Sequence, residues 1–397
     1  MLMEKPPKRW QGMALFGYGF RPFFLFASLF AVLAMALWLG ELARWSVLSS
    51  DLAPVEWHKH EMLFGYTSAV IAGFLFTAVP NWTGRFPVMG WPLIGIFSLW
   101  AIGRLGMLLG GGLSYPIVAV LDILFLPVLA LVMGREIWAG NNKRNLKVLI
   151  PVGLMAVANI WFHIDIMDAG TGEFPIRLGF ACVILLLMLI GGRIIPSFTR
   201  NWLAKQQGEK MPVPFSRFDA VAIGFSFLAL LAWVFVETAP VVLSGLLAVS
   251  GGLQAARLLR WRGHRTLANP LLLVLHIFYA ALPIGMALLA AGVWLDDSQL
   301  ATAALHMFGI GAAGGLTISV MTRASIGHTG RELRADGVMK VMFTAVALSA
   351  ILRVVGALLP EADWVVTAAG ISWIVAFGLF AMKVGPWLAT KRKSAGS

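Results

Sequence analysis

The chain has 397 residues, of which 59% are hydrophobic and only 13% are charged, and its mean hydropathy is +0.82. A soluble domain averages about 45–50% apolar and about 25% charged residues, so this composition excludes an ordinary soluble enzyme and indicates an integral membrane protein. The formal net charge of +12 would suit a nucleic-acid-binding protein. The basic residues instead follow the pattern of a membrane topology, which excludes nucleic acid as a partner.

Apolar segments of transmembrane length follow one another along the whole chain, joined by short loops. A membrane-spanning helix needs roughly 20 mostly apolar residues, and we predict an all-α integral membrane bundle of about twelve such helices. The predicted spans are residues 19–40, 57–80, 91–112, 115–137, 147–168, 175–198, 219–238, 240–260, 268–294, 299–322, 338–359 and 363–387. The seventh and eighth spans meet at Thr238-Ala239-Pro240 and form either an outer turn or a kinked pair.

The charged residues alternate in sign from loop to loop. With the N-terminus placed inside, most of the 31 Lys and Arg fall on inner loops or inner helix ends, whereas acids such as Asp51 and Asp168 fall on outer loops. The inner clusters include one at Lys5, Lys8 and Arg9 and one at Lys391, Arg392 and Lys393. This positive-inside pattern predicts that both termini are cytoplasmic.

We predict one polytopic membrane domain over residues 1–397, with no separate soluble part. Helices 1–6 occupy about residues 19–198, a basic cytoplasmic loop follows at 199–218, and helices 7–12 occupy 219–387. Six spans on each side of this loop would suit the internal repeat of a transporter, although the two halves share no clear sequence echo. The single cysteine, Cys182, lies inside a span, where it has no partner for an internal disulfide and is expected to be a packing residue.

Histidines provide the main indication of function. His163, His276 and His306 lie within predicted spans, and His58 and His60 open the second span. Ionisable side chains in hydrocarbon are costly and usually functional, and imidazole is a common ligand of haem iron and copper. At about 1.5 Å per residue, His60, His163 and His306 share the outer half of the membrane, so we predict a metal centre there.

The remaining histidines differ in position. His58 and His60 are two residues apart, so on one helix they point to roughly opposite sides and can serve different centres. His276 lies somewhat on the inner side of the midplane and is expected to belong to a deeper or a second centre. His264 lies in a basic inner loop and is expected to be solvated. The alternative for each buried histidine is a simple hydrogen bond to a neighbouring carbonyl.

Arginines inside the spans form the second candidate set. Arg104 and Arg193 lie within predicted helices, and Arg177 and Arg353 lie near outer helix ends. A buried guanidinium needs a carboxylate, which either Asp122 on the fourth span or a haem propionate would provide. An interhelical ion pair and snorkelling to the interface are equally compatible with the sequence.

Small residues follow His306 in the run 309–315, which allows close approach of either a helix or a flat macrocycle. The same span continues through residues 317–331, a segment rich in hydroxyl and basic side chains that includes His328. This inner rim would bind an anion or another inner ligand, or it is only a capped helix end.

Three segments resemble the signatures of the NnrS family: residues 57–66 (WHKHEMLFGY), 192–201 (GRIIPSFTRN) and 321–331 (MTRASIGHTGR). The resemblance extends over the whole chain and its twelve-span layout. It implies a haem- and copper-containing protein of the bacterial inner (cytoplasmic) membrane that is associated with nitric oxide metabolism and nitrosative-stress tolerance. It also implies a ligand set that consists of His58, His60, His163, His276, His306 and His328.

These observations lead us to expect a haem-copper redox enzyme that reduces nitric oxide to nitrous oxide. Glu61 and Tyr66 are the catalytic candidates, and Asp165 or Asp122 would also deliver protons. Because no soluble electron-entry domain is present, electrons would come from quinol or from a separate cytochrome. The alternatives are a haem- and copper-containing protein that binds nitric oxide without turnover, and a transporter of metal or haem.

Overall fold

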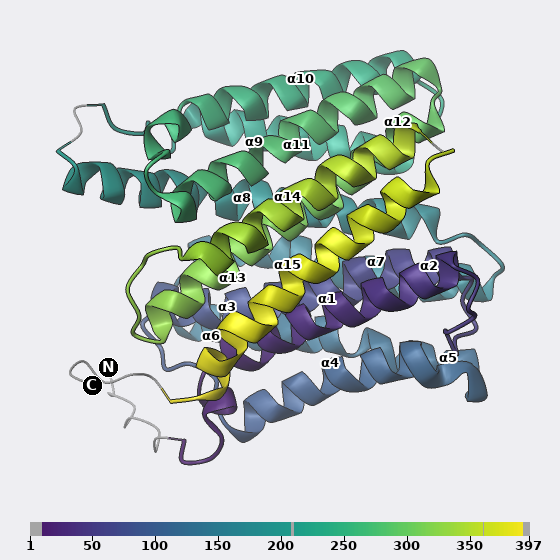
Figure 1. Cartoon of the computed structure of the whole chain (residues 1–397), viewed down its shortest axis with the longest axis horizontal. Coiled ribbons are helices and arrows are strands. Elements are labelled where there is room, and N and C mark those ends of the chain that lie inside the picture. Colours follow the sequence, from purple (N-terminus) through teal and green to yellow (C-terminus); the bar gives the residue numbers. More distant parts are fainter. Residues whose placement is uncertain (1–9, 208–209, 360, 392–397) are drawn as a thin grey trace. The chain divides into compact units, whose positions relative to one another are not determined.

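The computed structural model describes residues 10–207, 210–359 and 361–391, and Figure 1 traces their helices. Among these residues twelve helical segments are long and apolar enough to cross a membrane, and no strand is present, which confirms the predicted all-α bundle. The basic residues Lys5, Lys8, Arg9, Arg392 and Lys393 lie outside the described residues. The twelve segments are Phe20–Leu42, Pro54–Thr83, Trp91–Gly112, Tyr115–Ala139, Lys143–Met167, Glu173–Lys205, Arg217–Phe235, Pro240–Leu259, Pro270–Leu295, Ser298–His328, Gly337–Leu358 and Asp363–Ala389.

Each predicted span overlaps one of these segments, and the differences lie at the ends. The seventh and eighth spans are separate helices on either side of a short turn that ends at Pro240, so they are not a kinked pair. The sixth helix continues to Lys205, which makes the predicted loop at 199–218 shorter. Pro196 lies inside this helix, and a proline ring there normally clashes with the carbonyl four residues earlier.

The chain divides into two compact units. Unit 1 comprises residues 1–172, 324–331 and 381–397, and unit 2 comprises 173–323 and 332–380. The division at Gly172 falls between the fifth and sixth spans, whereas the sequence suggested a division at the basic loop after the sixth.

Unit 1 is built around helix α3. Helix α1 packs on α3, α3 packs on α6, and α6 packs on α7, while α4 pairs with α5. The helices of this unit are η1 (Ala14–Gly17), α1 (Phe20–Leu42), α2 (Pro54–His60), η2 (Glu61–Thr67), α3 (Ser68–Thr83), α4 (Trp91–Leu109), η3 (Gly110–Gly112), α5 (Tyr115–Ile123), α6 (Phe125–Ala139), η4 (Lys143–Val148) and α7 (Leu149–Met167). The last residues of α13 and α15 complete it.

Unit 2 has α10 and α11 at its centre. Helix α10 packs between α9 and α11, α11 contacts α12, and α12 contacts α14. Its helices are α8 (Glu173–Lys205), α9 (Arg217–Phe235), α10 (Pro240–Leu259), η5 (Gly263–Thr266), α11 (Pro270–Leu295), α12 (Ser298–His306), η6 (Met307–Gly314), α13 (Gly315–His328), α14 (Gly337–Leu358) and α15 (Asp363–Ala389).

Ordinary start signals place several helix ends. Pro54, Pro240 and Pro270 occupy first-turn positions, where a missing N–H costs nothing. The side chains of Asp297 and Asp336 accept hydrogen bonds from the first free N–H groups of α12 and α14. These local signals fix where each helix begins, and hence the depth at which its polar side chains lie.

Two helical segments are wound as π-helices, and each directly follows a candidate histidine. Segment η2 begins one residue after His60, and η6 begins one residue after His306. A π-helix is rare and is found most often at functional sites, because its wider turn re-aims the neighbouring side chains. The backbone therefore departs from regular α-helix at two of the predicted ligand positions.

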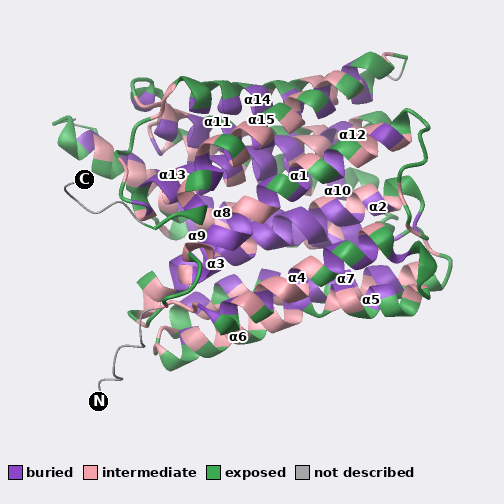
Figure 2. Cartoon of the chain, turned by 60° about the horizontal axis from the view of Figure 1, so that its bottom comes forward, coloured by how far each residue is buried: buried purple, intermediate pink, exposed green. Residues whose placement is uncertain are grey.

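Exposed residues lie along the helices (Figure 2), and many of them are large apolar residues. Leu131, Leu228 and Ile351 are all more than half exposed although they lie well inside spans. A soluble protein rarely exposes apolar surface on this scale, whereas lipid covers such faces in a membrane protein. A multi-pass membrane protein is therefore supported by length, composition and the surface of the helices.

Candidate metal centre

His60 is the last residue of α2 and is fully buried in unit 1. Its Nδ1 lies 2.8 Å from Oε1 of Glu61. Its Nε2 lies 2.8 Å from Oδ1 of Asn159 on α7 and 3.1 Å from Oδ2 of Asp122 on α5. Both ring nitrogens therefore face oxygen atoms.

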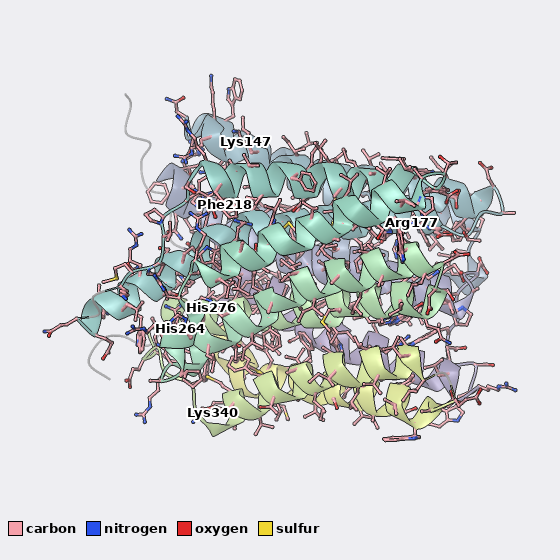
Figure 3. The ribbon with its side chains drawn as sticks, turned by 90° about the horizontal axis from the view of Figure 1, so that it is seen from above. Lys147, Arg177, Phe218, His264, His276 and Lys340 are labelled. Atoms are coloured by element: carbon pink, nitrogen blue, oxygen red, sulfur yellow. The ribbon has the colours of Figure 1, made fainter. Side chains whose placement is uncertain are left out.

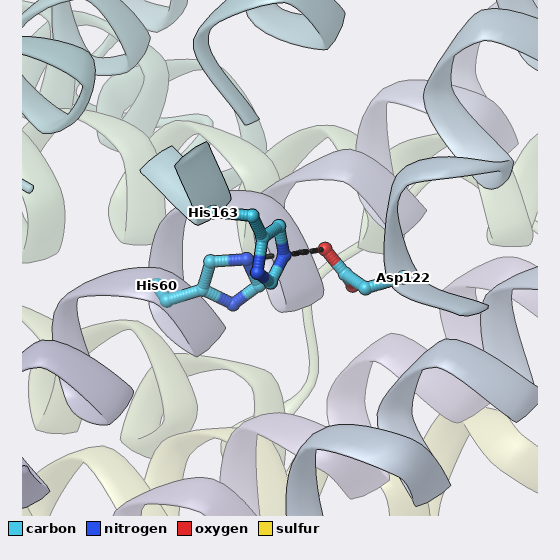
Figure 4. A group of neighbouring side chains, drawn as sticks. All are labelled: His60, Asp122 and His163. Carbon is cyan, nitrogen blue, oxygen red and sulfur yellow. Dashed lines mark hydrogen bonds and ion pairs between the residues drawn. The ribbon is translucent and has the colours of Figure 1, made fainter. Parts of the chain in front are cut away.

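His163 approaches the same carboxylate from α7. Its Nε2 lies 3.0 Å from Oδ2 of Asp122, and its Nδ1 lies 2.9 Å from the hydroxyl of Tyr115. The centroids of the His60 and His163 rings are 5.1 Å apart. One ligand atom each from His60, Asp122 and His163 lies within 4.8 Å of the other two, as Figure 4 shows. Of the predicted ligands, the structure thus brings His60 and His163 together.

Arg104 of α4 supplies the positive charge of this cluster. Its guanidinium forms ion pairs with both Glu61 and Asp122, and all three side chains are buried. The predicted protein partner, Asp122, is confirmed, and Glu61 is added to it. In this arrangement the carboxylates that Arg104 needs come from the protein.

His58 faces a different neighbour, as its spacing from His60 predicted. Its ring stacks on Trp38 of α1, with centroids 4.5 Å apart and planes 16° from parallel. It is only half-buried, while His60 is fully buried. The two histidines of the segment therefore do not share the centre that Asp122 forms.

In unit 2, His306 ends α12 and stands at the start of π-helix η6. Its Nδ1 lies 2.8 Å from the carbonyl oxygen of Thr302, an acceptor, so Nδ1 carries the proton. The lone pair is then on Nε2, for which the described residues offer no hydrogen-bond partner. Arg353 of α14 interacts electrostatically with His306. None of the described residues forms an ion pair with Arg353.

His276 lies near the start of α11, in the same unit. Its Nε2 is 2.9 Å from the hydroxyl of Thr199, which itself donates to the carbonyl of Ile195. The buried Nδ1 has no hydrogen-bond partner among the described residues. Gly263 lies against this edge of the ring, where a Cβ atom would come within 2.7 Å of Nδ1. His264 is exposed, as predicted, and Figure 3 shows it beside His276 at the end of the helices opposite to Arg177.

His328 ends α13 within unit 1. Its ring packs against Tyr18 and Phe20, with centroids 5.7 and 5.3 Å away. Burial raises the pKa of the Tyr18 hydroxyl, which therefore stays neutral beside the imidazole. The hydroxyl-rich rim that the sequence suggested is largely turned inward, since Thr322, Ser325 and Thr329 are fully buried.

The other predicted residues lie elsewhere. Arg177 pairs with Glu173 one turn earlier and has Glu237 at 3.6 Å, so its carboxylates come from the protein. Arg193 is exposed on α8. Tyr66 is buried in π-helix η2, in the same segment as Glu61.

Sequence analysis missed two members of the centre, Asn159 and Tyr115. Asn159 donates to Oδ2 of Asp122 at 2.8 Å as well as facing His60. Helical spacing was the available signal: Asn159 lies four residues before His163, and Tyr115 lies seven before Asp122. Residues at such separations share one face of a helix.

A second buried polar network, also missed, surrounds Arg257 of α10. Its guanidinium lies 3.2 Å from Asp219, 2.7 Å from Gln254 and 2.9 Å from the hydroxyl of Tyr279. A Cβ on Gly192 would clash with the same guanidinium, which accounts physically for a glycine at the start of segment 192–201. Because protein groups on α9, α10 and α11 accept the hydrogen bonds of Arg257, this network connects these helices and has a structural role.

Two sets of residues fit the metal and the haem that the segment resemblance implies. His60 and His163 direct Nε2 atoms at one carboxylate oxygen and hold their Nδ1 atoms against Glu61 and Tyr115, as ligating histidines do. His306 would hold haem iron through Nε2, and its cationic neighbour Arg353 would suit a propionate. His276 fits a small ligand better than a macrocycle, because Gly263 closes over its Nδ1 edge.

Comparison with protein-family models gives one match, to the NnrS protein family, over residues 14–392. This match covers nearly the whole chain, and the chain therefore belongs to the NnrS family. Membership supports a haem- and copper-associated membrane protein related to nitric oxide. No curated protein matched the chain.

Proposed function

We propose that this NnrS-family chain is a haem- and copper-dependent redox enzyme of nitrosative-stress defence that reduces nitric oxide. Two molecules of nitric oxide, two electrons and two protons give one nitrous oxide and one water. The observation that carries the proposal is the convergence of His60 and His163 on Asp122, deep within the apolar helices of unit 1. Ionisable groups buried in a membrane are functional by default.

Each histidine of the centre is oriented by a second group, which is what a metal site requires. The carboxylate of Glu61 faces Nδ1 of His60, and the hydroxyl of Tyr115 faces Nδ1 of His163. Such partners fix the tautomer and the orientation of ligating imidazoles. When bound at such a centre, a metal with an open position supplies Lewis-acid binding of a small molecule and a path for electrons.

The haem would be held in unit 2 by His306, and Arg353 would receive a propionate. The carbonyl of Thr302 fixes the proton of His306 on Nδ1 and so leaves Nε2 for the iron. In η6, Gly311 and Gly314 are closely packed against Ala281 and Trp373, whereas Gly309, nearer to His306, has space for a larger neighbour. His58, His276 and His328 are the remaining candidate ligands, and Arg104, Arg177 and Arg193 act in our proposal as structural cations.

Protons would reach the centre through its own acidic groups. Glu61 is buried beside His60, and its Oε2 has no hydrogen-bond partner among the described residues. This carboxylate is our proposed proton relay, which would accept a proton before it passes one on, and Tyr66 of the same π-helix is the second candidate. The electron donor would be quinol or a separate cytochrome, and the location would be the bacterial inner membrane.

The first experiment is the optical spectrum of the purified protein, reduced with dithionite, before and after addition of nitric oxide. We expect a haem band that shifts on addition, and nitrous oxide produced with a chemical reductant and detected by gas chromatography. The His306→Ala variant should lose a haem signal that the matched His264→Ala variant keeps, because His264 is exposed. An unchanged spectrum in His306→Ala would reject that assignment.

The other outcomes identify the alternatives. A shifted haem band without nitrous oxide would show a protein that binds nitric oxide without turnover. The absence of haem in protein made with ample haem, together with metal flux in proteoliposomes, would favour a transporter.

A further inference from the structure

We infer that Asp122 is a direct ligand of the metal at His60 and His163, so that the centre is a site of two histidines and one carboxylate for a divalent transition-metal ion, Cu(II) or non-haem Fe(II). This inference rests on the proposed function, because that function also requires a metal at His60 and His163. It goes further by adding a ligand that is not a histidine, and the ligand sets chosen from sequence consisted of histidines alone.

The Nε2 atom of His60 requires either an additional proton or a metal ion between it and the oxygen atoms that it faces. Its Nδ1 faces the Glu61 carboxylate, which accepts, so Nδ1 carries a proton in the neutral ring. Its Nε2 then carries a lone pair, yet it faces Oδ1 of Asn159 and Oδ2 of Asp122, which are also acceptors. Turning the Asn159 amide over does not help, because its oxygen would then face the Asp122 carboxylate. Either an additional proton, carried by His60 or by Asp122, or a metal ion resolves this arrangement.

One oxygen of Asp122 is the point where the nitrogen atoms meet. Its Oδ2 lies 3.1 Å from Nε2 of His60 and 3.0 Å from Nε2 of His163. Two ligands that bind one ion at about 2.0–2.2 Å are themselves about 2.8–3.6 Å apart for octahedral to tetrahedral angles. The two nitrogen–oxygen separations at Asp122 are therefore in the range of neighbouring ligands on one metal, and the three ligand atoms lie within 4.8 Å of one another.

The charges of the cluster also call for a cation. Glu61 and Asp122 each contribute one negative charge, and Arg104 contributes one positive charge, which leaves one negative charge with neutral histidines. All of these groups are buried within apolar helices. An uncompensated charge in such a place is strongly unfavourable, and a bound cation removes it.

A metal explains more of the site than a proton on His60 does. A single proton satisfies one nitrogen–oxygen contact, whereas one ion satisfies both Nε2 atoms and Oδ2 together. It leaves each Nδ1–H for its own acceptor, Glu61 for His60 and Tyr115 for His163. This pairing of inner ligands with outer hydrogen bonds is the usual arrangement around ligating histidines.

The donor set selects the kind of metal. Sulfur ligands favour Cu(I), and the described residues of the cluster contain none. Two imidazoles with one carboxylate and open positions are typical of non-haem Fe(II), and mixed nitrogen and oxygen donors also suit Cu(II). Metal analysis of the protein decides between these two ions.

The test measures metal per polypeptide by mass spectrometry in purified, full-length protein, with haem iron determined separately from the optical spectrum. We expect about one non-haem ion in the wild type and in Asp219→Asn, the matched change at a buried, arginine-paired acid of unit 2. We expect at least a tenfold loss in Asp122→Asn, with haem content unchanged. The identity of the ion, copper or iron, follows from the same measurement.

Metal titration is limited to variants that fold, which are recognised because they keep their haem and elute as single species. Metal-stripped wild type and variants that keep their haem and elute as single species are titrated with Cu²⁺ and with Fe²⁺. Tyr115→Phe and Glu61→Gln should weaken binding roughly 10–100-fold, as expected for changes outside the ligand set, and Asp122→Asn should weaken it more than either. Binding in Asp122→Asn equal to that of the wild type would overturn the inference, as would a weaker effect than that of Tyr115→Phe.

The two proposals fail in different ways. Loss of the ion in His60→Ala and His163→Ala, but not in Asp122→Asn, would remove Asp122 from the ligands and leave the proposed function intact. Wild-type protein without any non-haem metal, and without Cu²⁺ or Fe²⁺ binding on titration, would overturn both, and the cluster would then be an imidazolium ion-pair network.

Discussion

Replacing Arg104 by Met tests the electrostatics of the unit 1 centre directly. Methionine keeps much of the side-chain length and apolar contact but removes the charge that pairs with Glu61 and Asp122. In metal-stripped protein the change leaves two buried carboxylates with no guanidinium. The matched control is Arg177→Met, because Arg177 pairs with the exposed Glu173.

The structure sets the expected size of the two effects. Breaking a buried ion pair by removing one partner costs about 3–5 kcal/mol, and Arg104 serves two buried carboxylates, so its loss belongs at the upper end of that range. An exposed pair between neighbouring turns contributes about 0–1 kcal/mol, so Arg177→Met should change the free energy of unfolding little.

Unfolding by denaturant in detergent, followed by tryptophan fluorescence, measures the free energy of unfolding of both Arg104→Met and Arg177→Met. Trp57 and Trp100 lie in unit 1, and Trp100 donates to the carbonyl of Gly65 in π-helix η2, so the signal reports on this region. Saturation with metal should reduce the penalty of Arg104→Met, because an ion that binds only the folded state stabilises it and also supplies the missing positive charge.

If metal-stripped Arg104→Met unfolds with the same free energy as the wild type, the carboxylates are not held as charges by Arg104. Adding Glu61→Gln to Arg104→Met should recover part of the loss, since a neutral pair no longer leaves that acid unpaired. A further loss of similar size would also contradict the electrostatic account.

Two further changes concern the surroundings of His276. Thr199→Val should lower the free energy of unfolding by about 1–3 kcal/mol, because it leaves the buried Nε2–H of His276 without an acceptor; Thr199→Ser keeps the hydroxyl and should be milder in the same denaturation assay. Gly263→Ala places a methyl group 2.7 Å from the His276 ring and should cost about 1–3 kcal/mol. Gly245→Ala, with open space around it, should not be destabilising, and equal effects of the two glycine changes would show that the contact at Gly263 is unimportant.

The spans of this protein were predictable because each depends on local sequence. A run of about 20 apolar residues specifies a membrane helix, and caps such as Asp297 and Asp336 act on the N–H groups that follow them directly. The opposite directions of His58 and His60 also follow from helical geometry. The charge pattern predicts which ends are cytoplasmic, and in Figure 3 His264 and Lys340, both predicted to be inner, lie at the end opposite to Arg177.

The membership of the centre depended on contacts between distant parts of the chain. His60 and Asn159 are 99 residues apart, and His163 and Asp122 are 41 apart. Predicted depth in the membrane placed His60 at the same level as both His163 and His306, because depth does not indicate which helices are neighbours. The packing of α5 against α7 places His163 of α7 beside Asp122 of α5.

Apolar length and helical rise specify the helices, their order and how far along each helix a polar residue lies, so these features were predictable from the sequence. Tertiary structure alone decided that Arg104 joins two protein carboxylates and that Tyr115 and Asn159 complete the site. It also decided that the backbone widens into π-helices after His60 and His306. These features arise from the fit of one helix against another, which no local pattern in the chain specifies.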